Sequence, residues 1–247
     1  MQDYPYVPKS ETSAETANNI RPFKKVAFNT QTGENYVSRE AYKTLRTNIL
    51  FCGSDIKSIV ITSTAEGEGK STTSSELAKS LADSGKKTLL IDADMRKSVM
   101  LRRSLRSGEI TGLSEVLSSL ASKEDAVFNT QDENFDVMFT GRFPPNPVEL
   151  LGNGKLKELL CAFREKYDYI IIDAPPLGPV IDAAVIAAAC DAAILVISPG
   201  KARRKDILAV KEQLQKSGTR ILGAVINESE KRNSSYKKYE KKGKYYY

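Results

Sequence analysis

A glycine-rich segment, STAEGEGKST at residues 63–72, joins an apolar strand pattern to a helical pattern and contains the residues with the clearest chemistry. Gly67 and Gly69 allow backbone amides to turn toward phosphate oxygens. Lys70 can reach the β- and γ-phosphates of a nucleotide, Ser71 can ligate Mg²⁺, and the helix start adds its positive dipole end. The spacing is that of a Walker A motif and predicts binding of ATP and Mg²⁺.

Carboxylates follow two further apolar strands and strengthen this prediction. Asp92 and Asp94 lie in LLIDADMR at 89–96, and Asp173 ends the strand in YIIIDAPP. Thr64 stands where the first glycine of a Walker A motif is usual, so the loop alone could be an ordinary turn, and each Asp alone could be a turn former or a helix cap. Because the carboxyl ends of parallel strands meet at one sheet edge, we expect all three carboxylates to face the Lys70 loop.

The elements that position these residues alternate along the chain between apolar strand patterns and helical patterns. Several strands are continuously apolar, as expected when helices cover both faces of a sheet. The pattern predicts an α/β fold of the P-loop NTPase type, with a doubly wound, mostly parallel sheet and helices on both faces. Strands are expected near 56–62, 87–92, 135–140, 169–173, 192–197 and 220–226, and helices near 38–53, 70–84, 113–120, 147–166, 181–189 and 203–217.

Composition excludes several classes of enzyme. The chain of 247 residues is 40% hydrophobic, enough for a substantial core, and it has no histidine. Histidine-dependent hydrolysis and His-ligated metal sites are therefore excluded. Cys52, Cys161 and Cys190 are far apart and form no CxxC motif, so neither a disulfide framework nor an iron–sulfur or zinc cluster is indicated, and a reducing cytoplasm is expected.

The charge is concentrated at the C-terminus. Residues 228–247 hold seven Lys or Arg and three Glu, a net +4 of the chain's +6, so no nucleic-acid partner is expected for the remainder. The sequence has no leader pattern and no membrane-spanning stretch. We expect a poorly ordered N-terminal arm at 1–36, one domain at 37–227 and a flexible basic tail at 228–247.

Tyrosines crowd the end of this tail. Five of the eleven lie among lysines, with no aliphatic residue to pack against: Tyr236, Tyr239, Tyr245, Tyr246 and Tyr247. A stacking segment for single-stranded nucleic acid or a membrane-surface tail would have a similar composition. Beside a nucleotide-binding loop, phosphate-accepting tyrosines are the better interpretation.

Taken together, these motifs resemble the bacterial tyrosine autokinases, or BY-kinases, of capsular and exopolysaccharide synthesis. The resemblance spans residues 38–247 and includes PPNPVELL at 144–151 and the segment 173–183, which continues from DAPP to VIDA. It is to the subtype in which the cytoplasmic kinase is separate from its membrane adaptor. The resemblance implies an ATP-dependent, non-specific protein-tyrosine kinase that autophosphorylates its C-terminal tyrosines. It also implies a transmembrane adaptor that recruits the kinase to the inner membrane face, a ring-shaped homo-oligomer and a cognate tyrosine phosphatase.

Roles for individual residues follow from the same resemblance. Lys70 and Ser71 would hold phosphate and Mg²⁺, while Asp92 and Asp173 would arrange the metal and its waters. Asp94 would receive or orient the tyrosine proton; the pKa values of Asp and Tyr differ by about 6 units, roughly 8 kcal/mol against full transfer before attack, which favours orientation. The implied catalytic residues are Lys70, Asp92, Asp94 and Asp173, the metal ligands are Ser71, Asp92 and Asp173, and the nucleotide-binding residues are Glu66, Gly67, Glu68, Gly69, Lys70, Ser71, Thr72 and Asn227.

Two of the implied roles have ordinary structural alternatives. Asn227 could read the adenine edge or could be a turn residue. Glu40, Lys43 and Arg46 match a family motif of the ring interface, except that lysine replaces the first arginine and loses its bidentate fork. The same residues could equally form a solvated helix face with one ion pair.

Three other kinds of P-loop protein share parts of this pattern. A partitioning or site-selection ATPase that binds DNA or membrane would share the fold, but it usually has an additional lysine where this chain has Ala65. An iron–sulfur scaffold ATPase does not fit the cysteine spacing. A regulator with an inactive P-loop does not fit the intact set of lysine, serine and three aspartates.

Overall fold

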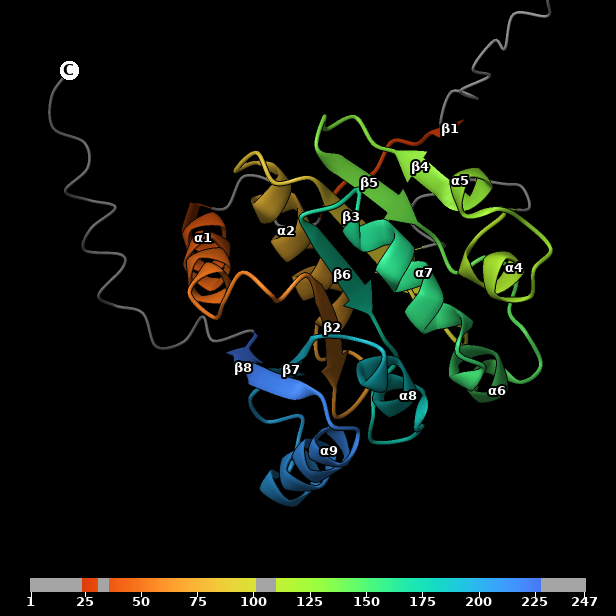
Figure 1. Ribbon diagram of the computed structural model, residues 1–247. Coiled ribbons are helices and arrows are strands. Elements are labelled where there is room, and N and C mark those ends of the chain that lie inside the picture. Colours follow the sequence, from red (N-terminus) through yellow and green to blue (C-terminus); the bar gives the residue numbers. More distant parts are fainter. Residues whose placement is uncertain (1–23, 31–35, 101–109, 228–247) are drawn as a thin grey trace, which may run out of the picture.

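The computed structural model describes residues 24–30, 36–100 and 110–227, and within them eight strands form one sheet (Figure 1). The strand order is β1-β4-β5-β3-β6-β2-β7-β8, and every neighbouring pair is parallel except β4 and β5. The strands are β1 Lys24–Lys25, β2 Ser58–Ser63, β3 Thr88–Asp92, β4 Val127–Asn129, β5 Phe135–Met138, β6 Tyr169–Asp173, β7 Ala192–Ile197 and β8 Arg220–Ile226.

Helices cover both faces of the sheet, which confirms the expected doubly wound α/β arrangement. They are α1 Tyr36–Leu50, α2 Lys70–Ala82, α4 Leu113–Leu117, α5 Lys123–Ala126, α6 Pro147–Gly152, α7 Lys155–Arg164, α8 Asp182–Ala188 and α9 Arg204–Lys216. No helix in the described ranges is both long enough and apolar enough to cross a membrane.

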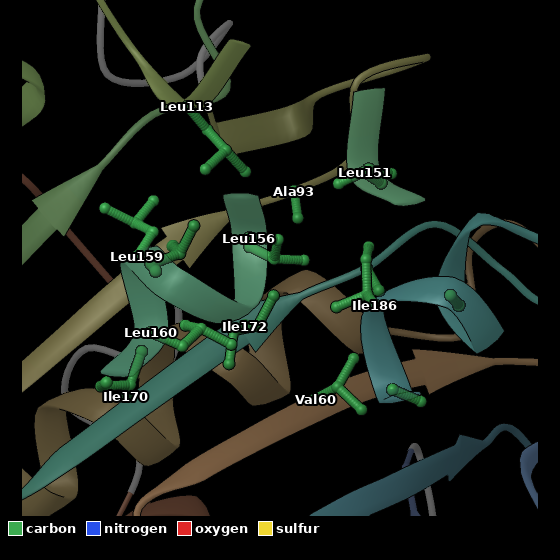
Figure 2. Close-up of a cluster of buried hydrophobic side chains, with 14 of the residues drawn as sticks. Val60, Ala93, Leu113, Leu151, Leu156, Leu159, Leu160, Ile170, Ile172 and Ile186 are labelled. Carbon is green, nitrogen blue, oxygen red and sulfur yellow. The ribbon is translucent and has the colours of Figure 1, made fainter. Parts of the chain in front are cut away.

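The core consists of two apolar layers, one on each face of the central strands. Successive side chains of a strand point to opposite faces, so Ile170 and Ile172 enter one layer and Ile171 enters the other. Figure 2 shows the first layer, where leucines of α7, Leu151 of α6 and Ile186 of α8 surround Val60 of β2 and the two isoleucines of β6. This packing fixes the strands that end at the Lys70 loop.

The structure differs from the sequence-based expectation between residues 147 and 166. One helix was expected there, but α6 ends at Gly152 and α7 begins at Lys155. Gly154 lies between them with φ +88°, a left-handed conformation that interrupts the helix and that glycine adopts without a Cβ clash. The expected strands are found close to their predicted positions, whereas the short elements β1, β4 and α5 were not expected.

Residues 24–30 also differ from the poorly ordered arm expected over residues 1–36. Lys24 and Lys25 pair with β4, and the Val26 amide donates to the Asn129 carbonyl at 3.0 Å. Phe28 is only 4% exposed and packs edge-on against Phe135 with ring centroids 5.6 Å apart. This segment therefore completes one edge of the sheet.

Candidate active site

The loop between β2 and α2 has the backbone shape of a phosphate-binding loop. Gly67 and Gly69 have φ +77° and +91°, left-handed values of the kind found in loops whose amides cradle an anion, just ahead of the start of α2 at Lys70. The φ angle of Gly69 favours glycine, and a Cβ there would lie 1.9 Å from Asn227 Nδ2 and displace that amide from the Glu68 carbonyl. The cradle fits a nucleotide phosphate.

Glu68 holds this loop from inside. Its buried Oε2 accepts hydrogen bonds from the Thr64 amide at 2.7 Å, the Thr64 hydroxyl at 2.6 Å and the Ala65 amide at 2.8 Å. The threonine found in place of the usual first glycine is thus bonded to a buried carboxylate. Glu68 was expected among the nucleotide-binding residues, and its side chain contacts Thr64 and Ala65 of the same loop.

Lys70 is surrounded by carboxylate side chains. Its ammonium group is 3.0 Å from Asp94 Oδ2 and 3.7 Å from Asp173 Oδ2, and it also donates to Ser71 Oγ at 3.3 Å. Burial by itself lowers the pKa of Lys70, but the charges of Asp173 and Asp94 raise it above its usual value. Lys70 is therefore a permanent cation at neutral pH.

Asp92 and Asp173 are partners in the register of β3 and β6 and are both buried. Burial and the negative charge of Asp173 raise the pKa of Asp92 to about 7. Burial also raises the pKa of Asp173, while Lys70 opposes that change. Two ionised carboxylates that are buried side by side repel each other, and a bound cation would stabilise them.

Serine hydroxyls orient both carboxylates. Ser98 Oγ donates to Asp92 Oδ2, and Ser74 Oγ donates to Asp173 Oδ1 at 3.2 Å. The oxygen donors Ser71, Asp92 and Asp173 suit Mg²⁺, which binds one or two carboxylates and takes its other ligands from phosphates and water. Among the described residues, no three His, Cys, Asp or Glu side chains form a group that could hold a metal ion by themselves.

Asp94 is held by backbone and side-chain donors at once. Its Oδ1 accepts from the Arg96 amide at 3.3 Å and the Lys97 amide at 2.9 Å, while Oδ2 accepts from Lys70. Arg96 in turn makes a two-pronged ion pair with Asp182, from Nε to Oδ2 at 2.8 Å and from Nη2 to Oδ1 at 3.0 Å. Both residues lie in sequence segments singled out above, but their pairing could not be read from spacing.

The remaining expected nucleotide-binding residues lie around the loop. Asn227 Nδ2 donates to the Glu68 carbonyl at 3.0 Å, so this side chain braces the phosphate loop. Lys201, from the segment after β7, donates to the Gly67 carbonyl at 2.8 Å. Glu66 is exposed and pairs with Lys97, and Thr72 is part-buried in the first turn of α2.

The residues expected at an oligomer interface separate into two groups on α1. Lys43 pairs with Glu40 at 2.7 Å on the exposed face. Arg46 Nη1 instead donates to the Ser80 carbonyl of α2 at 2.6 Å, within the same chain. The tail tyrosines Tyr236, Tyr239, Tyr245, Tyr246 and Tyr247 lie outside the described residues.

Comparisons with known proteins agree with this geometry. Residues 56–217 match the AAA domain family. The chain is 44% identical to the Streptococcus agalactiae tyrosine-protein kinase CpsD over 84% of this chain and 90% of that protein. It is 41% identical to the Bacillus subtilis tyrosine-protein kinase YwqD over 77% of this chain and 81% of that protein.

Solved structures give the same order of similarity. The kinase domain of the Escherichia coli tyrosine kinase ETK superimposes with a TM-score of 0.72 at 32% identity, covering 76% of this chain and 74% of that one. The Pyrococcus horikoshii septum site-determining protein MinD, solved with Mg-ADP, gives 0.60 at 28% identity, with 72% of each chain covered. The nucleotide-binding fold is shared by both, and the similarity to the tyrosine kinase is the greater.

Proposed function

The chain belongs to the family of bacterial tyrosine-protein kinases, and from this premise we propose that it transfers the γ-phosphoryl group of ATP to tyrosines at its own C-terminus. The observation that carries the proposal is the juxtaposition of Lys70 with Asp94 and Asp173 at the end of a phosphate-binding loop. Bound Mg-ATP would supply the phosphoryl group, with Mg²⁺ neutralising part of its charge.

Residues of this chain account for the rest of the chemistry. Lys70 and the loop amides would neutralise phosphate oxygens, and Ser71, Asp92 and Asp173 would hold Mg²⁺ and its waters. Asp94 would orient the attacking tyrosine hydroxyl, because two backbone amides fix one of the Asp94 oxygens. It would accept the tyrosine proton late in the reaction. Such positioning suffices for a loose phosphoryl-transfer transition state.

The position of β8 supports the C-terminal tyrosines as acceptors. β8 ends at Ile226, and Asn227 then contacts the phosphate loop through the Glu68 carbonyl. The chain therefore leaves the domain at the edge of the sheet where the site lies. Tyr236 follows nine residues later in the sequence.

Partners are proposed on the same family basis. A membrane adaptor would recruit and activate the kinase at the inner membrane face, Glu40, Lys43 and Arg46 would contribute to a homo-oligomeric ring, and a phosphatase would remove the phosphates. The pathway served would be capsule or exopolysaccharide synthesis. For Arg46 to contribute, it would have to act alongside its bond to Ser80 or exchange that bond.

Intact mass and peptide mapping after incubation with Mg-ATP test the kinase activity, with and without the cytoplasmic segment of a candidate adaptor. We expect steps of one phosphate on residues 236–247, and no steps in Lys70→Met or when the five tail tyrosines are changed to Phe. Lys79→Met is the matched control, because Lys79 is also on α2 and ion-paired, but to Asp83 and Asp132 at the surface. ATP hydrolysis without any mass gain, even with adaptor, would contradict the proposal and favour a partitioning-type ATPase.

A further inference from the structure

We infer that Arg96 and Asp182 are positioning residues for phosphoryl transfer, acting through Asp94; this inference rests on the function proposed above. Arg96 follows Asp94 by two residues in the turn after β3. Asp182 is the first residue of α8, nine residues after Asp173. Their ion pair thus links the two segments that follow the carboxylates of the site.

The geometry of the pair is specific for arginine. Two parallel hydrogen bonds of 2.8 and 3.0 Å join the guanidinium edge to both oxygens of Asp182, an arrangement that the single ammonium group of lysine cannot reproduce. The Asp182 side chain is fully buried, whereas 41% of the Arg96 side chain is exposed. A buried carboxylate without a partner is costly, so Asp182 restricts Arg96 to this orientation.

Asp182 is itself fixed by the core. The helix that it begins buries Ala183, Ile186 and Ala187 in the apolar layer drawn in Figure 2. Close-packed interiors deform little, so this end of the ion pair is a rigid support.

The other end of the pair acts on Asp94. The Arg96 and Lys97 amides donate to Asp94 Oδ1, so holding the Arg96 side chain holds the turn that aims this carboxylate. The opposite oxygen of Asp94 meets Lys70 at 3.0 Å. A continuous series of contacts therefore runs from the core through α8, Asp182 and Arg96 to the carboxylate that would receive the tyrosine proton, and a small displacement of such a group costs rate steeply.

Arg96→Lys and Asp182→Asn test the inference, because each keeps approximate shape while removing the fork or its charge. Each enzyme variant, and the wild type beside it, carries the five Tyr→Phe changes in its own tail, and the phosphate acceptor is the Lys70→Met chain, which has an intact tail. For each variant, kcat and KM for phosphoryl transfer, the Kd for Mg-ADP by calorimetry and the urea midpoint are measured. We expect kcat to fall at least tenfold with the Kd for Mg-ADP within threefold of wild type, and the double variant to lose no more than the worse single one.

Arg164→Lys is the matched control. Arg164 also pairs with a carboxylate, through Nη1 to Asp191 Oδ2, but at the opposite end of the sheet, beside the start of β2. This variant should lower the urea midpoint while kcat stays within twofold.

The inference is overturned if Arg96→Lys keeps kcat within twofold of wild type, if its loss of kcat matches the unfolded fraction alone, or if Arg164→Lys loses as much. These outcomes all require a wild-type chain that transfers phosphate. A wild-type chain that only hydrolyses ATP would instead overturn the proposed function.

Discussion

At the scale of single residues, the Lys70 ammonium group interacts with all three carboxylates of the site. It contacts Asp94 and Asp173 directly, and its charge also favours the ionised form of Asp92. Removing it would take away the cation that pairs with the buried Asp94 and Asp173 carboxylates. The same residue that would bind phosphate therefore also stabilises the close approach of these carboxylates in the fold.

Two glycines of the phosphate loop should respond differently to the same change. Gly67→Ala meets open space, so it should cost only about 1 kcal/mol of unfolding free energy for its left-handed φ. Gly69→Ala has the same kind of strain and also collides with Asn227, so about 2–3 kcal/mol and a marked loss of Mg-ADP affinity are expected. Urea unfolding and calorimetry measure both.

The double variant Gly69→Ala/Asn227→Ala controls for the collision. It should recover part of the stability lost in Gly69→Ala, because the amide that blocks the new Cβ is gone. Equal costs for Gly67→Ala and Gly69→Ala would contradict this account.

Asp191 gives the fold a pH-dependent contribution. Burial alone raises its pKa, but hydrogen bonds from the Ser58 and Lys57 amides and from Arg164 lower it below the usual value. A carboxyl whose pKa is lower in the folded chain stabilises the fold above its unfolded pKa of about 4, and this stability is lost as the pH falls through the lower folded value.

Asp191→Asn should therefore reduce the unfolding free energy by about 1–2 kcal/mol at pH 7. The difference from wild type should shrink as the pH is lowered from 5 toward 3. Urea titrations at several pH values check this, and a difference that stays constant down to pH 3 would refute it.

At the scale of elements, the segment of residues 24–30, which includes β1, should contribute measurably to stability. Phe28 is buried against Phe135 and Phe139, so Phe28→Ala should cost about 3 kcal/mol. Phe51→Ala, at a side chain that is 83% exposed, is the control and should change stability by less than about 0.5 kcal/mol. Comparable losses in the two variants would show that residues 24–30 do not pack as described.

Elements with a strong local signal could be predicted from the sequence, and the others depend on tertiary contacts. The continuous apolar runs of β2, β3, β6 and β7 predict these strands, and the pattern after the glycine-rich loop predicts the helix that begins at Lys70. β1 is two lysines, whose pairing with β4 and whose neighbour Phe28, buried against Phe135 and Phe139, depend on contacts far along the chain. The break at Gly154 likewise depends on one backbone angle.

The site was predictable to a similar extent. Motif spacing supplied Lys70, Ser71 and the three aspartates, because parallel strands bring their carboxyl ends to one edge. It could not supply the partners that orient them, since Ser98 on Asp92, Glu68 on Thr64 and Asp182 on Arg96 are joined by side-chain geometry.

At the scale of the whole molecule, phosphorylation should change how copies of the chain associate. Five phosphates add about −7.5 to −10 charges, which reverses both the +4 of residues 228–247 and the chain's +6. We expect phosphorylated chains to repel one another and the native mass to fall relative to unphosphorylated protein at the same ionic strength. The variant with five Tyr→Phe changes should keep its mass after incubation with Mg-ATP, and an unchanged mass for the phosphorylated wild type would rule out the charge effect.

The contact between Asn227 and the phosphate loop also affects how well tyrosines of other proteins compete with the chain's own tyrosines for the site. Nine residues of chain reach at most about 32 Å, so Tyr236 is confined near its own loop at an effective concentration on the order of 10 mM. A free protein present at about 1 μM meets the same site about ten thousand times less often. Tyrosines of other proteins would therefore be modified mainly when they are tethered nearby or when the chain's own tyrosines are already occupied.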